Sequence, residues 1–115
     1  MRITKVFPDT KLDLSAKGVS DKKLVGMEQY LKEHKNIVEL DLSWNNISAE
    51  GAKILSKIST IKILNLSSTL IGNEGAEVLA KNKNIETLFL SGCGIGKSGI
   101  IALATNTTIS NLVFL

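Results

Sequence analysis

Three stretches of this sequence, IVELDLSWNNI at 37–47, IKILNLSSTLI at 61–71 and IETLFLSGCGI at 85–95, follow one pattern at a step of 24 residues. A shorter copy, ISNLVFL, starts at Ile109, and an earlier copy, KLDLSAKGV at 11–19, stands 28 residues before the first in register. A constant step of this length is typical of repeat proteins, in which each unit buries its apolar face only against its neighbours. The sequence therefore predicts a solenoid of stacked units.

Each unit is expected to contain a strand and a short helix. In the tripeptide L-x-L the two leucines point to one face of a strand and the middle residue to the other. Further along, Ala52, Leu55 and Ile58 recur at helical spacing, which predicts a helix with one buried stripe. The expected capping residues, at or next to the helix starts, are Ser20, Ser48 and Asn73.

The copies share the pattern L-x-x-L-x-L-x-x-(N/T/C)-x-I, and on these residues the chain from about Asp9 to Leu115 resembles the leucine-rich repeat family. The second half of the repeat, with Gly51, Gly75 and Gly99 in register, resembles the ribonuclease-inhibitor-like class. The resemblance implies an α/β fold. It would be a right-handed, horseshoe-shaped solenoid with parallel strands on the concave face and short helices on the convex face.

We expect a single domain over residues 1–115 with about four and a half repeats. The expected boundaries are 9–36 for an N-terminal capping repeat, then 37–60, 61–84 and 85–108, and a partial repeat at 109–115. The family usually has Asn or Cys at the ninth repeat position, which here holds Lys17, Asn45, Thr69 and Cys93. Cys93 is therefore expected to serve its turn and not to act as a nucleophile.

Composition narrows the class of protein. Of the 115 residues, 43% are hydrophobic and 22% are charged, which excludes a disordered chain, and the single cysteine excludes an internal disulfide framework. The net charge of +3 comes with one arginine and few aromatic residues, so no nucleic-acid partner is expected. Neither a secretory signal nor a membrane span is visible. We expect a cytoplasmic protein with no membrane partner, or one exported by a route that the sequence does not show.

The segment SGCGIGKSG at 91–99 contains two partial phosphate-binding motifs. Its glycines match G-x-G-x-x-G, and Gly96–Ser98 matches the end of a P-loop, with Lys97 as the phosphate-binding lysine. Both motifs are incomplete, because Ser91 stands where the P-loop needs glycine and the acidic residue of the dinucleotide motif would fall beyond the last residue. We therefore expect no nucleotide, cofactor or metal.

The other candidates for chemistry lack partners in the sequence. His34 is the only histidine and lies at an expected helix end, where it would interact with the helix C-terminus. The carboxylates Asp9, Asp13, Glu39 and Asp41 are expected to form a solvated face, since no other acid–base group lies in register with them. We expect no enzymatic activity.

Strand residues that point away from the core are the better functional candidates. They change from acidic to apolar along the repeats, and large apolar groups at such positions are typical of interaction hot spots. The predicted function is non-catalytic binding of an unidentified protein partner through the concave face. The candidate contact residues are Asp41, Trp44, Ile63, Asn65, Phe89 and Val113.

Structural roles for the same residues stay open. In that interpretation Trp44 packs against its loop, and Phe89 is covered by a further repeat. The chain also ends on a strand with no helix after it, which predicts an uncovered apolar end. The alternative functions are therefore a self-associating solenoid, such as a homodimer through that end, and a fragment of a larger leucine-rich-repeat protein.

Overall fold

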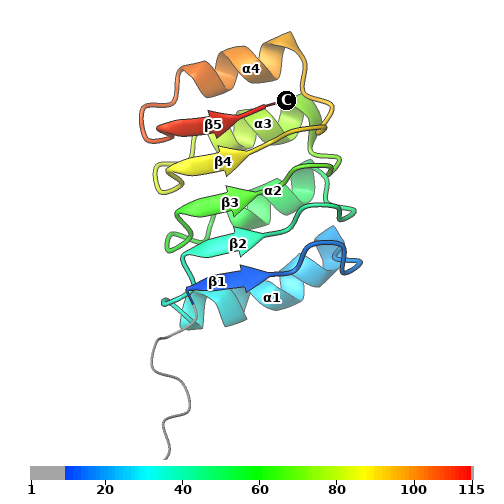
Figure 1. Cartoon of the computed structure of the whole chain (residues 1–115), viewed down its shortest axis with the longest axis vertical. Helices are drawn as coiled ribbons and strands as arrows, with labels where there is room; N and C mark the ends of the chain where they lie inside the picture. The colour runs from blue at the N-terminus through cyan, green and yellow to red at the C-terminus, as the bar shows by residue number, and fades with distance from the viewer. Residues whose placement is uncertain (1–9, 115) are drawn as a thin grey trace, which may run out of the picture.

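The computed structural model describes residues 10–114. The expectations that concern Asp9, Leu115 and the segment before Asp9 lie outside the described residues. Strands and helices alternate strictly along this part of the chain (Figure 1). The elements are β1 (Lys11–Asp13), α1 (Asp21–Glu33), β2 (Glu39–Asp41), α2 (Ala49–Leu55), β3 (Ile63–Asn65), α3 (Gly72–Ala80), β4 (Thr87–Phe89), α4 (Lys97–Ala104) and β5 (Asn111–Val113).

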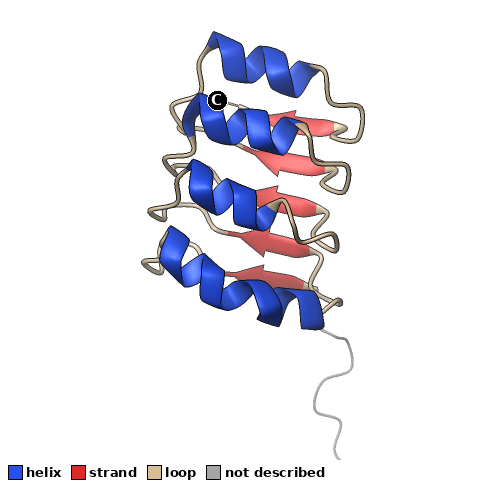
Figure 2. Cartoon of the chain, turned by 180° about the vertical axis from the view of Figure 1, so that it is seen from behind, coloured by secondary structure: helices blue, strands red, loops and turns tan. Residues whose placement is uncertain are grey.

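The strands form one parallel sheet in chain order, and their central leucines are paired neighbours throughout. Helices α1 to α4 form a second layer on one side of the sheet, the side that faces the viewer in Figure 2. In Figure 1 each strand points to the right in front, and the chain returns to the left through the helix behind it while moving up by one unit. The connections are therefore right-handed. This is the right-handed α/β solenoid that the resemblance to the leucine-rich repeat family implied, and that prediction is confirmed.

The core lies between the two layers and is aliphatic. Leu40 and Leu42 are fully buried, and Leu64 and Leu66 occupy the same two places one repeat later. Equivalent positions thus supply one continuous apolar interior. Leu12 of the first strand is only half-buried, because a terminal unit has a neighbour on one side alone.

A buried amide satisfies the turn that follows β1 and β2. Asn45, which is 7% exposed, accepts through Oδ1 from the backbone N–H groups of Lys17 and Val19, at 3.1 and 2.9 Å. Its Nδ2 donates to the carbonyls of Leu14 and Leu42, at 2.9 and 3.0 Å. One side chain therefore bonds backbone groups of two successive repeats, which would otherwise be buried without partners.

Thr69 and Cys93 hold the equivalent position in the next two repeats. The Thr69 hydroxyl donates to the Leu66 carbonyl at 2.7 Å, and the Cys93 thiol donates to the same oxygen at 2.9 Å. Cys93 is 3% exposed and belongs to the hydrophobic core. Its contacts are those of the structural role that the repeat register predicted.

A second set of amides, which the sequence analysis did not identify, organises the turns from helix to strand. Asn82 accepts through Oδ1 from the N–H groups of Asn84 and Ile85, both at 2.7 Å. Asn106 makes the equivalent pair of bonds one repeat later, and its Nδ2 donates to the Ala80 carbonyl of the preceding repeat at 2.7 Å. The recurrence of asparagine at a step of 24 residues was a signal for this role.

Two of the expected helix caps are confirmed, and one side chain acts differently. The hydroxyls of Ser20 and Ser48 accept from N–H groups in the first turns of α1 and α2. Asn73 lies inside the first turn of α3 and gives its own helix no side-chain cap. Its Oδ1 instead accepts from the N–H groups of Gly96 and Gly99, at 2.7 and 3.1 Å, and so caps α4 of the next repeat.

The glycines in register, Gly51, Gly75 and Gly99, mark places where a side chain would collide with the neighbouring structure. A Cβ atom on Gly75 would lie 2.6 Å from the Cβ of Ile71, which is fully buried and has no room to move. Gly26, in the middle of α1, differs because a Cβ there meets no atom within 4 Å. The repeat therefore requires glycine at one helical position and merely tolerates it at another.

We expect Gly75→Ala to lower the free energy of unfolding by about 1–3 kcal/mol, through overpacking against Ile71. Gly26→Ala is the matched control and should raise it by about 0.5–1 kcal/mol, since alanine favours the helix and no contact is strained. Urea denaturation of both variants measures the two effects. Equal stabilisation by both substitutions would contradict the close packing described for Gly75.

Candidate interaction surface

None of the helices in residues 10–114 covers one face of the sheet, and we call it the open sheet face (Figure 1). It consists of the strand residues whose side chains point away from the leucines. One row follows the first strand residues and the other follows the last. The residues are Lys11, Glu39, Ile63, Thr87 and Asn111 in the first row, and Asp13, Asp41, Asn65, Phe89 and Val113 in the second.

The strand register places five of the six candidate contact residues on this face. Asp41, Asn65, Phe89 and Val113 are successive neighbours in the second row, and Ile63 lies beside them in the first. All five are half-buried, because adjacent strands lie only about 5 Å apart and their side chains shield one another. Phe89 is flanked by Asn65 and Val113, so the neighbouring strands cover part of its ring.

The polar members of the second row terminate their strands. Asp41 Oδ1 accepts from the N–H and the hydroxyl of Ser43, at 3.0 and 2.6 Å. Asp13 binds Ser15 in the same way, at 3.0 and 2.7 Å, and Asn65 Oδ1 accepts from the N–H of Ser67. These are local turns in which an Asx side chain bonds the backbone two residues on. The side chains are therefore held in one orientation before any partner arrives.

The charge of Asp13 is also stabilised. Hydrogen bonds from the Ser15 hydroxyl and N–H, together with the nearby charges of Lys11 and Lys17, hold the pKa of this carboxyl below its ordinary value. Asp13 thus stays ionised to lower pH than a free aspartate. The arrangement gives a fixed anion on the surface.

Trp44 lies at the edge of the open sheet face, in the turn that follows β2. It is 70% exposed, so it does not pack against its own loop. Its backbone has φ +60°, and the equivalent residues Ala16, Ser68 and Gly92 are left-handed as well. Only glycine adopts this conformation without cost, and the strain is of order 1 kcal/mol for other residues. A bond from the Trp44 N–H to the Ser67 carbonyl of the next repeat, at 3.0 Å, helps to hold the turn.

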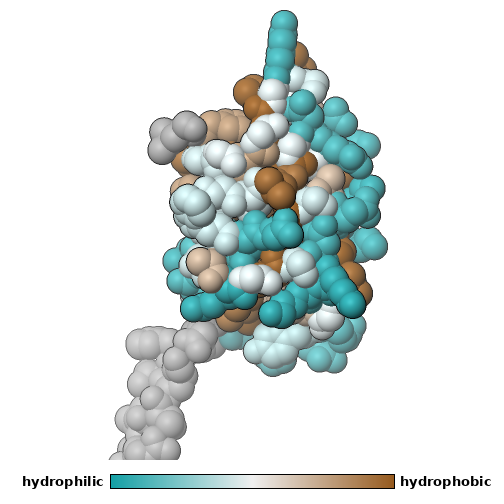
Figure 3. Space-filling view, turned by 90° about the vertical axis from the view of Figure 1, so that its right-hand side faces the viewer, coloured by the Kyte–Doolittle hydropathy of each residue, from teal (hydrophilic) through white to brown (hydrophobic). Residues whose placement is uncertain are grey.

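The surface of this turn edge is mixed in polarity. Figure 3 shows separate apolar residues between hydrophilic ones, with no single continuous apolar patch on this side of the molecule. Leu70, in the next turn along the edge, is 68% exposed. Large exposed apolar groups at successive turns, rimmed by polar ones, are typical of sites that contact other macromolecules.

The phosphate-binding motifs in 91–99 are not assembled as such. Two N–H groups at the start of α4, those of Gly96 and Gly99, already donate to Asn73. N–H groups at a helix N-terminus are the ones that bind phosphate in motifs of this kind. Gly94 has φ +67° and serves the turn after β4. The repeat register accounts for the contacts of this segment.

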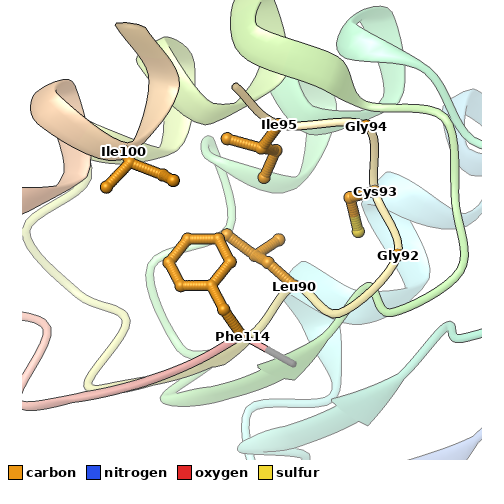
Figure 4. Close-up of a pocket in the computed structure, with 7 residues that line it drawn as sticks. All are labelled: Leu90, Gly92, Cys93, Gly94, Ile95, Ile100 and Phe114. Atoms are coloured by element: carbon orange, nitrogen blue, oxygen red, sulfur yellow. The ribbon is translucent and has the colours of Figure 1, made fainter. Parts of the chain in front are cut away.

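A cavity of about 350 Å³ opens at the C-terminal end of the described residues. It lies between the turn after β4 and the first residues of α4. The ring of Phe114 stands beside Leu90 and points towards Ile95 and Ile100 (Figure 4). The side chains that line it are apolar, and the buried thiol of Cys93 is the one titratable group among them. The cavity therefore suits an apolar contact.

Other potential sites give no constellation within residues 10–114. The ring of His34 stacks on Tyr30 with centroids 3.8 Å apart, and its Nδ1 lies 2.7 Å from the Tyr30 carbonyl at the end of α1. No group of three or more His, Cys, Asp or Glu side chains in the described part is placed to hold a metal ion. The helices of that part are also too short or too polar to span a membrane.

Stacked strand–helix units with one uncovered sheet face define this protein as an α/β solenoid. The family model for the leucine-rich repeat matches residues 33–56, 57–80 and 81–104, which together make up more than half of the chain. The chain therefore belongs to the leucine-rich repeat family. The match does not separate subclasses, so the ribonuclease-inhibitor-like class stays a prediction.

A similar solved structure is the one titled leiomodin-1 actin-binding site 2. The two share a TM-score of 0.71 at 19% sequence identity, over 94% of this chain and 72% of that chain. At this identity the likeness supports the fold alone. A search of curated protein sequences gave no match.

The cap between repeats made by Asn73 can be tested directly. We expect Asn73→Ala to lower the free energy of unfolding by about 1–2 kcal/mol, because two N–H groups of α4 lose their acceptor. Asn73→Asp should be nearly neutral, since Asp21 holds the equivalent position in the first repeat and accepts from the Ser48 N–H at 2.9 Å. Thermal denaturation followed by circular dichroism compares the two, and an Asn73→Ala protein as stable as the Asp variant would refute the cap.

Proposed function

We propose that this protein is a non-catalytic module that binds a protein partner across the open sheet face and the adjoining turn at Trp44. Leucine-rich repeats typically mediate protein–protein interaction and are generally non-catalytic. The leiomodin-1 structure is described as an actin-binding site, which fits a binding role for a solenoid of this kind. We propose Asp41, Trp44, Ile63, Asn65, Phe89 and Val113 as the contact set.

The conformation of Trp44 is the observation that carries the proposal. An indole side chain is kept 70% exposed on a backbone at φ +60°, where the equivalent residue of the β4 turn is glycine. Neither burial nor local geometry favours tryptophan at this position, and it contributes no core packing. Exposed tryptophan is among the residues most enriched in binding hot spots. Binding to a partner would compensate for both the strain and the exposure.

The surface is also suited to binding with little ordering. Asp41 and Asn65 are oriented by their own turns, and the sheet rows are fixed by strand pairing. A partner would therefore meet a preformed surface and lose less entropy than on a flexible one. This support is independent of the argument from Trp44.

Affinity capture tests the proposal. The wild type, a Trp44→Ala/Phe89→Ala variant and a Val25→Ala control would each be used as bait. Val25 is a large apolar residue, 62% exposed, on α1 of the helical layer, so its loss leaves the open sheet face intact. We expect a specific partner to be retained by the wild type and the control but not by the double variant. Equal retention by all three would overturn the proposal.

A substitution by glycine separates binding from stability. We expect Trp44→Gly to raise the free energy of unfolding by about 0.5–1 kcal/mol, because the left-handed conformation suits glycine, and to weaken partner binding. Ser68→Gly relieves the same strain at φ +58° without removing an aromatic group, so it should stabilise and leave binding unchanged. Chemical denaturation and binding assays on both variants give the comparison. Normal binding by Trp44→Gly would remove tryptophan from the contact set.

Self-association is a second candidate, favoured by the apolar ends of the solenoid. The cavity beside Phe114 opens at one end, and a second cavity of about 390 Å³, lined by Leu12, Leu14 and Met27 among others, opens at the other. Light scattering over a range of concentrations distinguishes the two functions. A mass that rises with concentration, and falls back in Phe114→Asp, would favour assembly through the ends.

The remaining expectations are proposals as well. We propose that residues 1–115 form one domain, with repeats beginning at 37, 61, 85 and 109 after a longer first unit. We also propose that the protein works in the cytoplasm and that no enzymatic step belongs to its function.

A further inference from the structure

The turns of the solenoid form two edges, one where helices return to strands and one where strands lead into helices. Charged residues are divided unequally between these two edges. The described turns from helix to strand contain five lysines and one acidic residue. These residues are Lys35, Lys57, Lys62, Lys81, Lys83 and Glu86. The turns from strand to helix, which hold Trp44, contain one charged residue in the described chain, Lys17. Asp13 and Asp41 stand at the ends of the strands that lead into this second edge.

This distribution determines which kind of segment the Trp44 edge attracts. A basic segment is repelled by the five lysines of one edge and drawn towards the carboxylates of the other, whereas an acidic segment is drawn the opposite way. Lys11 pairs with Glu39 at 3.5 Å, and Lys17 lies near Asp13. Asp41 forms no ion pair among the described residues, and residues 37–52 contain no lysine or arginine.

Asp41 and Trp44 belong to the same strand–turn segment and offer complementary groups. The Asp41 carboxylate is held by Ser43 through Oδ1, so its direction is fixed. The indole three residues later is exposed on a turn that strand pairing holds rigid. A guanidinium group binds a carboxylate through its planar N–H donors and stacks on an indole face, whereas an ammonium group does only part of this.

We infer that the partner presents an arginine-bearing, positively charged segment to Asp41 and Trp44, with an apolar side chain that reaches Phe89. The inference rests on the proposed function and names the chemistry of the partner for the same surface. Two strand spacings separate Asp41 from Phe89, which is about 10 Å. An extended segment that crosses the strands covers this span in about three residues. The arginine and the apolar residue should therefore be about three to four residues apart.

A phage-displayed library of random peptides, about twelve residues long so as to exceed the width of the face, tests the inference with the full-length protein as bait. We expect the selected peptides to carry net positive charge, to contain arginine more often than lysine, and to have an apolar residue at the stated spacing. Their affinity should fall with added salt. The selected sequences themselves thus report the partner's chemistry.

Two substitutions that remove the same charge from different faces provide the matched control. Asp41→Asn should weaken the selected peptides about five- to tenfold, and the turn should survive because Asn65 makes the equivalent bond to Ser67. Glu50→Gln, on the exposed side of α2, should change affinity less than about twofold. Lys17→Gln should strengthen binding, since it removes the positive charge that the described strand-to-helix turns contain.

The outcomes separate this inference from the proposed function. Peptides that need Trp44 and Phe89 but lack basic residues, or that bind Asp41→Asn as well as the wild type, overturn the inference and leave the proposed function standing. Peptides indifferent to the Trp44→Ala/Phe89→Ala variant count against both. Failure of any peptide to be enriched over bait-free resin also overturns the inference, because the surface would then not take a short charged segment.

Discussion

Parallel pairing of short leucine strands is the interaction on which the rest of this structure depends. Each strand contributes only three residues, so the sheet is stable only if the turns at both ends are fully hydrogen-bonded. Asn45 does this where strands end, and Asn82 and Asn106 do it where helices return to strands. Because these amides bond the backbone of a neighbouring repeat as well as their own, each turn also fixes the spacing between units.

The spacing between units in turn decides what other side chains do. Asn73 reaches the first turn of α4, and Asp21 reaches Ser48, because successive helices start side by side. The glycines in register exist for the same reason, since Gly99 lies against Asn73 and Ala76 of the preceding repeat. Gly96 and Gly99, which belong to the phosphate-binding patterns in the sequence, therefore bond the preceding repeat through Asn73.

Most side chains of the repeats are used in packing or in local hydrogen bonds. The polar ends of the strands are bonded within their own turns, and the core consists of aliphatic side chains and one thiol. Trp44 is an exception, because it is large, aromatic, exposed and held in a backbone conformation that disfavours it. A rigid scaffold that exposes such a group three residues after a carboxylate held by its own turn is suited to recognition.

The sequence by itself determined the fold, the strand positions and the residues of the open sheet face, because a 24-residue step and the L-x-L alternation are local properties that stacking only repeats. The resemblance to the leucine-rich repeat family also predicted the turn role of Cys93. Only the tertiary structure decided that Trp44 is exposed, that Phe89 and Ile63 are half-buried, and that Asn73 caps the next helix. These outcomes depend on how far apart successive repeats lie and which groups then meet. That distance is set by strand pairing between residues 24 positions apart, so it cannot be derived from the sequence of one repeat alone.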